Sequence, residues 1–122
     1  MKQWNDRAPT VQLLGRYQPW HQGHTELFKR AHAKTGQVCI MIRDTLGTDE
    51  KNPFDFITVK NSIINSLNDA GFENEADYKI INVPNITNIT YGRDVGYAIE
   101  KEYLGEEIEK ISATQIRREM NI

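Results

Sequence analysis

Gly15-Arg16-Tyr17-Gln18-Pro19-Trp20-His21-Gln22-Gly23-His24 is the stretch that decides the fold of this chain. It follows a short apolar run, residues 10–14, that predicts a strand, and it precedes residues 25–33, whose pattern predicts a helix. A helix start offers unpaired backbone N–H groups and the positive end of the helix dipole, which together favour phosphate. Two imidazoles at that point can donate hydrogen bonds to an oxyanion as negative charge develops on it.

The segments on either side of this stretch alternate between strand and helix patterns. A helix is predicted over about 23–34, a strand over 37–42, a helix over 55–70 and a strand over 78–83. The run at 37–42 is continuously apolar, which is typical of a strand buried on both faces. Short links between strand, helix and strand imply parallel pairing with right-handed crossovers. The pattern therefore predicts an α/β domain whose ligand lies at the carboxyl ends of the strands.

The ends of the chain have weaker patterns. Residues 1–9 are polar without a period and predict a leader segment that pairs with nothing. Residues 86–91 predict either a loop or a fourth strand, residues 96–104 a short helix, and the acidic residues 105–110 a solvated link. The S-x-x-Q pattern that opens residues 112–120 predicts a capped helix. We expect all 122 residues to form one domain.

The composition limits the possible partners. The formal net charge is −2, which argues against a general nucleic-acid binder. The single cysteine, Cys39, cannot form an internal disulfide, and no apolar run is long enough to span a membrane, so a cytoplasmic protein is expected. Basic residues gather in or beside the motifs, and this pattern suits a polyanionic small molecule. They are Arg16, Arg43, Lys51, Arg93, Arg117 and Arg118.

Two motifs at opposite ends of the chain carry a family resemblance. They are His21-Gln22-Gly23-His24 and Ile111-Ser112-Ala113-Thr114-Gln115-Ile116-Arg117. They resemble H-x-G-H and I-S-x-T-x-x-R, the signatures of nucleotidyltransferases that join a nucleoside triphosphate to a phosphorylated acceptor and release pyrophosphate. The longer pattern G-R-x-Q-P-x-H-x-G-H, with Asn52-Pro53-Phe54, is most similar to nicotinamide mononucleotide adenylyltransferases. The length is nearer to that of small cytidylyltransferases.

This resemblance implies a fold, a cofactor and an assembly. The expected fold is a single Rossmann-like open parallel sheet with helices on both faces. Mg²⁺ is expected to accompany the nucleoside triphosphate, and no metal site on the protein is predicted. Relatives commonly form dimers or larger rings, so a homodimer or higher homo-oligomer is expected.

The resemblance also assigns roles to residues. The expected catalytic residues are His21, His24, Lys51 and Arg117. The histidines would stabilise the α-phosphate, while Lys51, on the long polar loop after the second strand, would contact phosphate. The expected nucleotide-binding set comprises the motif loop, where glycines let the backbone come close, and the C-terminal motif, which would hold the β- and γ-phosphates. These residues are Gly15, Arg16, Tyr17, Gln18, His21, Gly23, His24, Ser112, Ala113, Thr114 and Arg117.

The acceptor and the base stay open. Asp44, Arg93 and Asp94 are candidate acceptor contacts, with a simple turn closed by Asp94 as the alternative reading. The first motif favours AMP transfer from ATP, and CTP is the alternative. A non-catalytic nucleotide-binding module is a further alternative. A purely structural domain would leave both motifs unexplained.

Overall fold

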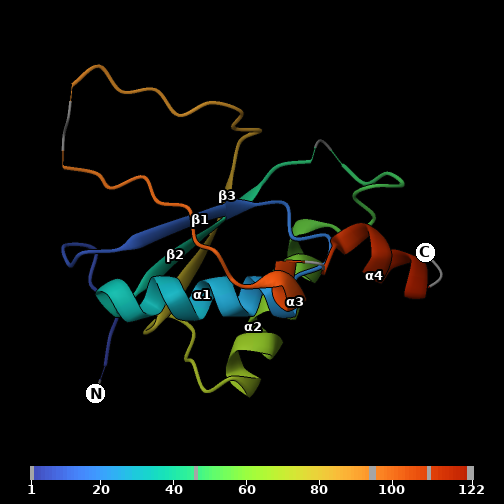
Figure 1. Ribbon diagram of the computed structural model, residues 1–122, viewed down its shortest axis with the longest axis horizontal. Coiled ribbons are helices and arrows are strands. Elements are labelled where there is room, and N and C mark those ends of the chain that lie inside the picture. The colour runs from blue at the N-terminus through green and yellow to red at the C-terminus, as the bar shows by residue number, and fades with distance from the viewer. Residues whose placement is uncertain (1, 46, 94–95, 110, 121–122) are drawn as a thin grey trace.

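A three-stranded parallel sheet, in the order β1-β2-β3, organises the computed structural model (Figure 1). The structure describes residues 2–45, 47–93, 96–109 and 111–120, without the side chains of 106, 109 and 113–115. The strands are β1 (Val11–Gly15), β2 (Val38–Arg43) and β3 (Tyr78–Val83). In the register of the sheet, Leu13 lies beside Ile40, and Ile40 lies beside Ile80. The predicted α/β class and parallel open sheet are confirmed.

Helices α1 (Gln22–Thr35) and α2 (Phe56–Asp69) form the two crossovers between these strands. Gly36 ends α1 at φ 82°, a left-handed conformation that glycine adopts without strain. Asp55 caps α2 by accepting a hydrogen bond from the Thr58 N–H. Two short helices follow, α3 (Glu106–Glu109) and α4 (Ala113–Glu119). None of the helices in the described part of the chain is long and apolar enough to cross a membrane.

Both crossover helices pack on one face of the sheet. Residues that are neighbours in the register, such as Val38 and Tyr78, share a face and are fully buried. They belong to one core cluster with Phe28 of α1 and Ile63 and Leu67 of α2. The strand order runs in one direction, so two right-handed crossovers must lie on the same side. The expectation of helices on both faces is therefore wrong for α1 and α2.

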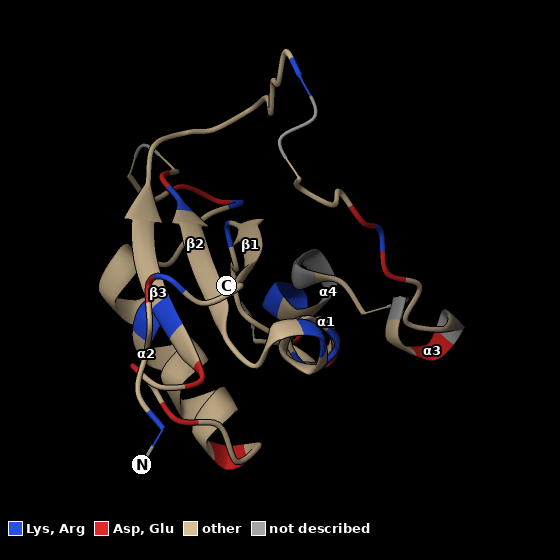
Figure 2. Ribbon diagram, turned by 90° about the vertical axis from the view of Figure 1, so that its left-hand side faces the viewer, with Lys and Arg blue, Asp and Glu red and all other residues tan. Residues whose placement is uncertain are grey.

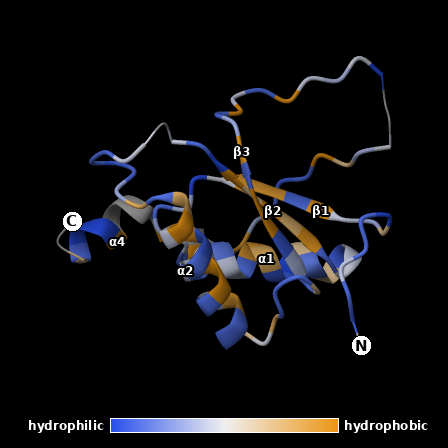
Figure 3. Ribbon diagram, turned by 180° about the vertical axis from the view of Figure 1, so that it is seen from behind, coloured by the Kyte–Doolittle hydropathy of each residue, from blue (hydrophilic) through white to orange (hydrophobic). Residues whose placement is uncertain are grey.

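The opposite face of the sheet is only half-buried. It carries apolar side chains from all three strands, namely Leu14, Cys39, Met41, Ile81 and Val83. The orange of the strands in Figure 3 marks the apolar residues of both faces together. The prediction that β2 is buried on both faces is therefore also wrong. A continuously apolar strand fits burial on two faces, but it does not require it.

The leader is tied to the amino-terminal ends of the strands. The Gln37 side-chain amide donates to the Asn5 carbonyl at 2.8 Å, and Lys2 forms an ion pair with Asp77. The prediction of an unpaired leader is wrong because polar groups beside β2 and β3 supply partners that lie more than 30 residues away in the sequence.

The segment after β3, which we call the arm (described residues 84–93 and 96–105), leaves the body of the domain as an extended chain (Figures 1 and 3). Its described residues form neither helix nor strand, so 86–91 is a loop and the helix predicted over 96–104 is wrong. Glu100 and Glu102 both contact the Lys34 ammonium group, at 3.2 and 2.5 Å. Residues two apart point the same way in an extended chain but not in a helix.

Isoleucines in α2 offer a matched test of the core. Ile63 is fully buried and Ile57 is 61% exposed. We expect Ile63→Ala to lower the free energy of unfolding by about 2–5 kcal/mol, because it loses buried methyl groups and leaves a cavity. We expect Ile57→Ala to change it by less than about 0.5 kcal/mol. Urea denaturation measures both, and equal losses would contradict the assignment of this core.

Candidate active site

His21 and His24 cap the start of α1 with their own side chains. The Nδ1 atom of His21 accepts a hydrogen bond from the Gly23 N–H at 3.0 Å. The Nδ1 atom of His24 accepts one from the His21 N–H, also at 3.0 Å. The two rings stack with their centroids 3.8 Å apart and an angle of 25° between their planes. The histidines thus fill the two places that Ser or Thr and Glu or Gln usually fill in a capping box.

These hydrogen bonds determine where each imidazole carries its proton. A ring nitrogen that accepts a hydrogen bond has no proton, so each neutral ring carries its proton on Nε2. Among the described residues, no hydrogen bond to either Nε2 atom is found. The start of α1 therefore presents two side-chain N–H donors, while the backbone N–H groups of Gly23, His24 and Thr25 are already bonded to His21.

The surroundings keep both rings neutral. Burial lowers the pKa of His21. Burial, reinforced by the charge that His21 would carry if protonated, lowers the pKa of His24 to about 3. Removing an imidazolium from water disfavours its charge, as does a second imidazolium nearby. At neutral pH the pair therefore acts as two neutral donors.

Aromatic rings bury His24. Tyr17 lies edge-on to His24 with the ring centroids 4.9 Å apart, and Trp20 lies at 5.2 Å. The Trp20 indole N–H donates to the Thr25 hydroxyl at 2.8 Å, which fixes the ring. The sequence interpretation assigned no role to Trp20 or Thr25. A large apolar residue inside a polar motif indicates a packing role, and this was the signal in the sequence that could have identified Trp20.

Glycines at positions 15 and 23 leave room for neighbouring rings. A Cβ atom at Gly15 would lie 2.9 Å from the Tyr17 ring, and one at Gly23 would lie 2.8 Å from Cε1 of His21. Both distances are shorter than real Cβ contacts. In this structure the close approach that these glycines permit is made by Tyr17 and His21.

The loop after β2 packs against the motif loop. Arg16 donates to the Asn52 side-chain oxygen at 3.3 Å. Asp49 accepts from the backbone N–H groups of Lys51 and Asn52, and these bonds keep the pKa of its carboxyl low. The Gln18 side chain reaches the backbone of Phe54. The sequence analysis named Asn52 only as part of a family pattern and gave Asp49 no role, although an Asp that bonds to the N–H groups just after it is a common turn device.

A cavity of about 120 Å³ opens beside this contact. It lies between the carboxyl ends of β2 and β3 and the start of α2. Gln18 and Phe54 form one wall, and Arg43, Asp44 and Asn82 contribute polar groups. The structure thus places the predicted acceptor residue Asp44 at a cavity that the motif loop also borders.

The C-terminal motif meets the motif loop through Arg117. This side chain is 9% exposed and its guanidinium donates to the Gln18 carbonyl. Ser112 is exposed, and its carbonyl accepts from the Ile116 N–H within α4. The side chains of Ala113 and Thr114 lie outside the description. The predicted roles of these residues at the triphosphate stay predictions.

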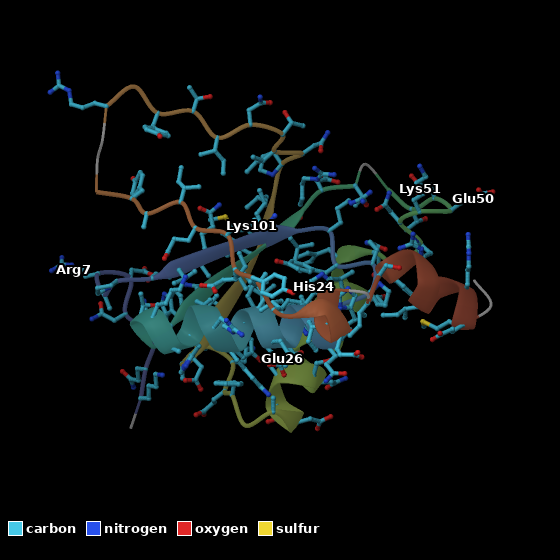
Figure 4. The ribbon with its side chains drawn as sticks, in the orientation of Figure 1. Arg7, His24, Glu26, Glu50, Lys51 and Lys101 are labelled. Atoms are coloured by element: carbon cyan, nitrogen blue, oxygen red, sulfur yellow. The ribbon has the colours of Figure 1, made fainter. Side chains whose placement is uncertain are left out.

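Two predicted cations lie away from the histidines. Lys51 is exposed on the loop after β2, well separated from His24 in Figure 4. Arg93 is exposed on the arm, and Asp94 lies outside the described residues. In Figure 2, basic and acidic residues lie side by side near the carboxyl ends of β1 and β2, whereas acidic residues mark α3 and the last part of the arm. The positive charges near the motif loop are therefore accompanied by the carboxylates of the loop after β2.

Comparison with known proteins gave no match, either among family models or among curated proteins.

The low pKa of His24 predicts a pH-dependent stability. The unfolded chain takes up a proton near pH 6.5, whereas folded His24 does so only near pH 3. Its contribution is therefore complete above pH 6.5 and is lost progressively as the pH falls toward 3. From pH 6.5 to 5 we expect the free energy of unfolding to drop by up to about 1.4 kcal/mol per pH unit for this one group.

Urea denaturation at pH 7.5, 6 and 5 tests this, with His24→Asn as the comparison. The change in the free energy of unfolding per pH unit should be smaller in the variant. An identical slope in both proteins would contradict a buried neutral His24.

Proposed function

We propose that this protein is a nucleotidyltransferase that transfers a nucleoside monophosphate, AMP from ATP in the leading version, to a small phosphorylated acceptor. One observation carries the proposal: the stacked pair His21–His24 holds both Nδ1 atoms on backbone N–H groups and so offers both Nε2–H groups at the start of α1. Donors of this kind suit a phosphate oxygen on which charge develops during transfer.

The proposed reaction is a single in-line displacement. An oxygen of the acceptor phosphate attacks the α-phosphorus, and the bond from that phosphorus to the oxygen bridging to the β-phosphorus breaks. The electron pair leaves with pyrophosphate. His21 and His24 donate hydrogen bonds to a non-bridging α-phosphate oxygen, and neither has to gain or lose a proton. Positioning and charge stabilisation account for most catalysis of this type, so no protein nucleophile is needed.

In this proposal, Mg²⁺ binds together with the nucleoside triphosphate. Mg²⁺ arrives on the phosphate oxygens of the nucleotide, where it commonly keeps several waters and few protein ligands. Arg16 is the cation of the motif loop itself, and its bond to Asn52 holds it beside the loop after β2. Arg117 and Lys51 are the further candidates for the β- and γ-phosphates.

The cavity beside Gln18 is the proposed acceptor site. Besides Gln18, its polar lining residues are Arg43, Asp44, Thr45, Thr48, Asp55 and Asn82. We expect such a mixed lining to take a small acceptor that carries hydroxyl groups as well as its phosphate. The position at the carboxyl ends of β2 and β3 supports this assignment, because ligands of open α/β sheets bind at that edge.

CTP in place of ATP is the alternative substrate. A non-catalytic nucleotide-binding module is a further alternative, and it would bind a triphosphate without releasing pyrophosphate with any acceptor. The pair of Nε2–H donors favours catalysis over binding alone, since binding does not require neutral histidines with a fixed tautomer.

Histidine variants test the proposal. We expect Mg·ATP, or Mg·CTP in the alternative, to raise the melting temperature, because a ligand at 100 times its Kd adds about 2.7 kcal/mol of stability. We expect His24→Ala to fold and to lower pyrophosphate release, measured with a panel of sugar, polyol and nucleoside monophosphates, by about 10²–10³-fold.

His32→Ala is the matched control, because His32 lies on the same helix but contacts Asp77, at 2.9 Å, away from the motif loop. Its pyrophosphate release should stay within a few-fold of wild type. Near-normal release by His24→Ala, or no response to any triphosphate, would refute the proposed function.

The exposed arm supports the expected homo-oligomer. Five large apolar side chains of the arm are 61–79% exposed, namely Ile89, Tyr91, Tyr97, Ile99 and Tyr103. We infer that a second copy of the chain covers them. Ion pairs of Glu102 with Lys34 and Arg30 hold the arm at one end. In a two-fold dimer, both copies would use this same surface of the arm.

Light scattering after gel filtration checks this inference. Wild type should have the mass of a dimer or larger assembly, and Tyr97→Ser combined with Ile99→Ser should have the mass of a monomer. Ile57→Ser, which removes an apolar side chain from α2 that is 61% exposed, should leave the mass unchanged. A monomeric wild-type protein would contradict the inference.

A further inference from the structure

Gln18 joins two loops that lie far apart in the sequence. Its side-chain nitrogen donates to the Phe54 carbonyl, and its side-chain oxygen accepts from the Phe54 N–H, both at 2.9 Å. The residue is 5% exposed. One amide thus satisfies both backbone groups of a single residue, as a neighbouring strand would, and the buried bonds have little competition from water.

The backbone of Gln18 makes a third connection. Its carbonyl accepts a hydrogen bond from the buried guanidinium of Arg117 on α4. Two residues before Gln18, Arg16 donates to the side-chain oxygen of Asn52, which lies two residues before Phe54. The motif loop, the loop after β2 and the C-terminal helix therefore converge within three residues of the motif.

This junction lies between the two halves of the proposed site. His21 is three residues after Gln18 along the chain. On the other side, Gln18 and Phe54 form one wall of the cavity between β2, β3 and α2. A change in the Gln18–Phe54 contact must shift that wall relative to the histidines.

We propose that Gln18 is a positioning residue. It fixes where the acceptor cavity and the loop of residues 49–54 lie relative to His21 and His24. It acts through its bonds to Phe54, whereas the sequence resemblance implied a direct part in binding nucleotide. The consequence for catalysis rests on the proposed function. The two hydrogen bonds between the Gln18 side chain and the Phe54 backbone, which we call the Gln18–Phe54 clamp, do not.

The chain contains a matched control. Gln37 is also 5% exposed, and its side-chain amide likewise bonds to the backbone of one residue, donating to the Asn5 carbonyl at 2.8 Å and accepting from the Asn5 N–H at 3.3 Å. Gln37 precedes β2, at the opposite end of the sheet from the histidines. Replacing either glutamine by methionine keeps the length of the side chain and removes the hydrogen bonds.

The first measurement is hydrogen exchange of single amides in the full-length protein. Gln18→Met should speed exchange of the Phe54 amide by at least about tenfold and leave the exchange rate of the Asn5 amide unchanged. Each substitution removes the acceptor of only one backbone N–H group, so only that amide becomes exposed. Gln37→Met should do the reverse. An unchanged Phe54 amide in Gln18→Met would overturn the clamp.

The second measurement is pyrophosphate release with Mg·ATP or Mg·CTP and the acceptor panel. Gln18→Met should lower kcat/KM for the acceptor by about 10²-fold, since a misplacement of about 1 Å costs that much, while the Kd for the triphosphate changes little. Gln37→Met should stay near wild type. Equal losses in the two variants would overturn the positioning role.

Further outcomes separate the clamp from the proposed function. A wild-type protein that releases no pyrophosphate refutes the function and the catalytic role of Gln18 with it, while exchange at Phe54 still decides whether the clamp exists. If Gln18→Met does not fold, Gln18→Glu serves instead. It keeps the acceptor for the Phe54 N–H but loses the donor, so protection at Phe54 should fall partway and kcat/KM should fall with it. Normal kcat/KM in Gln18→Glu would overturn the role.

Discussion

Two hydrogen bonds from backbone N–H groups to imidazole nitrogens, at the start of α1, determine most of the candidate site. They hold Nδ1 of His21 and His24 as acceptors, so the protons lie on Nε2. A side chain at position 23 would push His21 out of this arrangement. Burial, to which Tyr17 and Trp20 contribute, is the main cause of the low pKa of His24, and the charge that the stacked His21 would carry if protonated lowers it further. Under the proposed function, helix capping and phosphate binding would use the same two side chains, the first through Nδ1 and the second through Nε2–H.

The short sheet brings the loops of the site together. Parallel strands end at one edge, so the loops after β1 and β2 meet there, and Gln18 and Phe54 join them. The same small sheet leaves its second face half-buried and the arm extended. Parallel sheets are normally covered on both faces. In the inferred homo-oligomer, a second copy of the chain would cover the exposed apolar side chains of the arm and the half-buried face of the sheet.

The cations of the proposed site fall into two groups. Arg16 and Arg117 are bound within the junction of loops, where their charge is held in place, whereas Lys51 and Arg93 are exposed. A fixed cation stabilises a developing charge without first having to reorganise. Under the proposed function, the junction would contribute positioned charge, and the outer residues would have to move toward the nucleotide in order to act.

Local signals in the sequence were enough to predict the strands, the two crossover helices and the placement of the histidines at a helix start. Periodicity, an Asp before α2 and a glycine after α1 act over a few residues, so the sequence carries them directly. Contacts between distant residues decided the rest. Lys34 holds Glu100 and Glu102 in an extended arm, Gln37 holds the leader, and the strand order puts both crossover helices on one face. The roles of Trp20 and of the Gln18–Phe54 clamp also appeared only in the tertiary structure, because their partners have no fixed spacing along the chain.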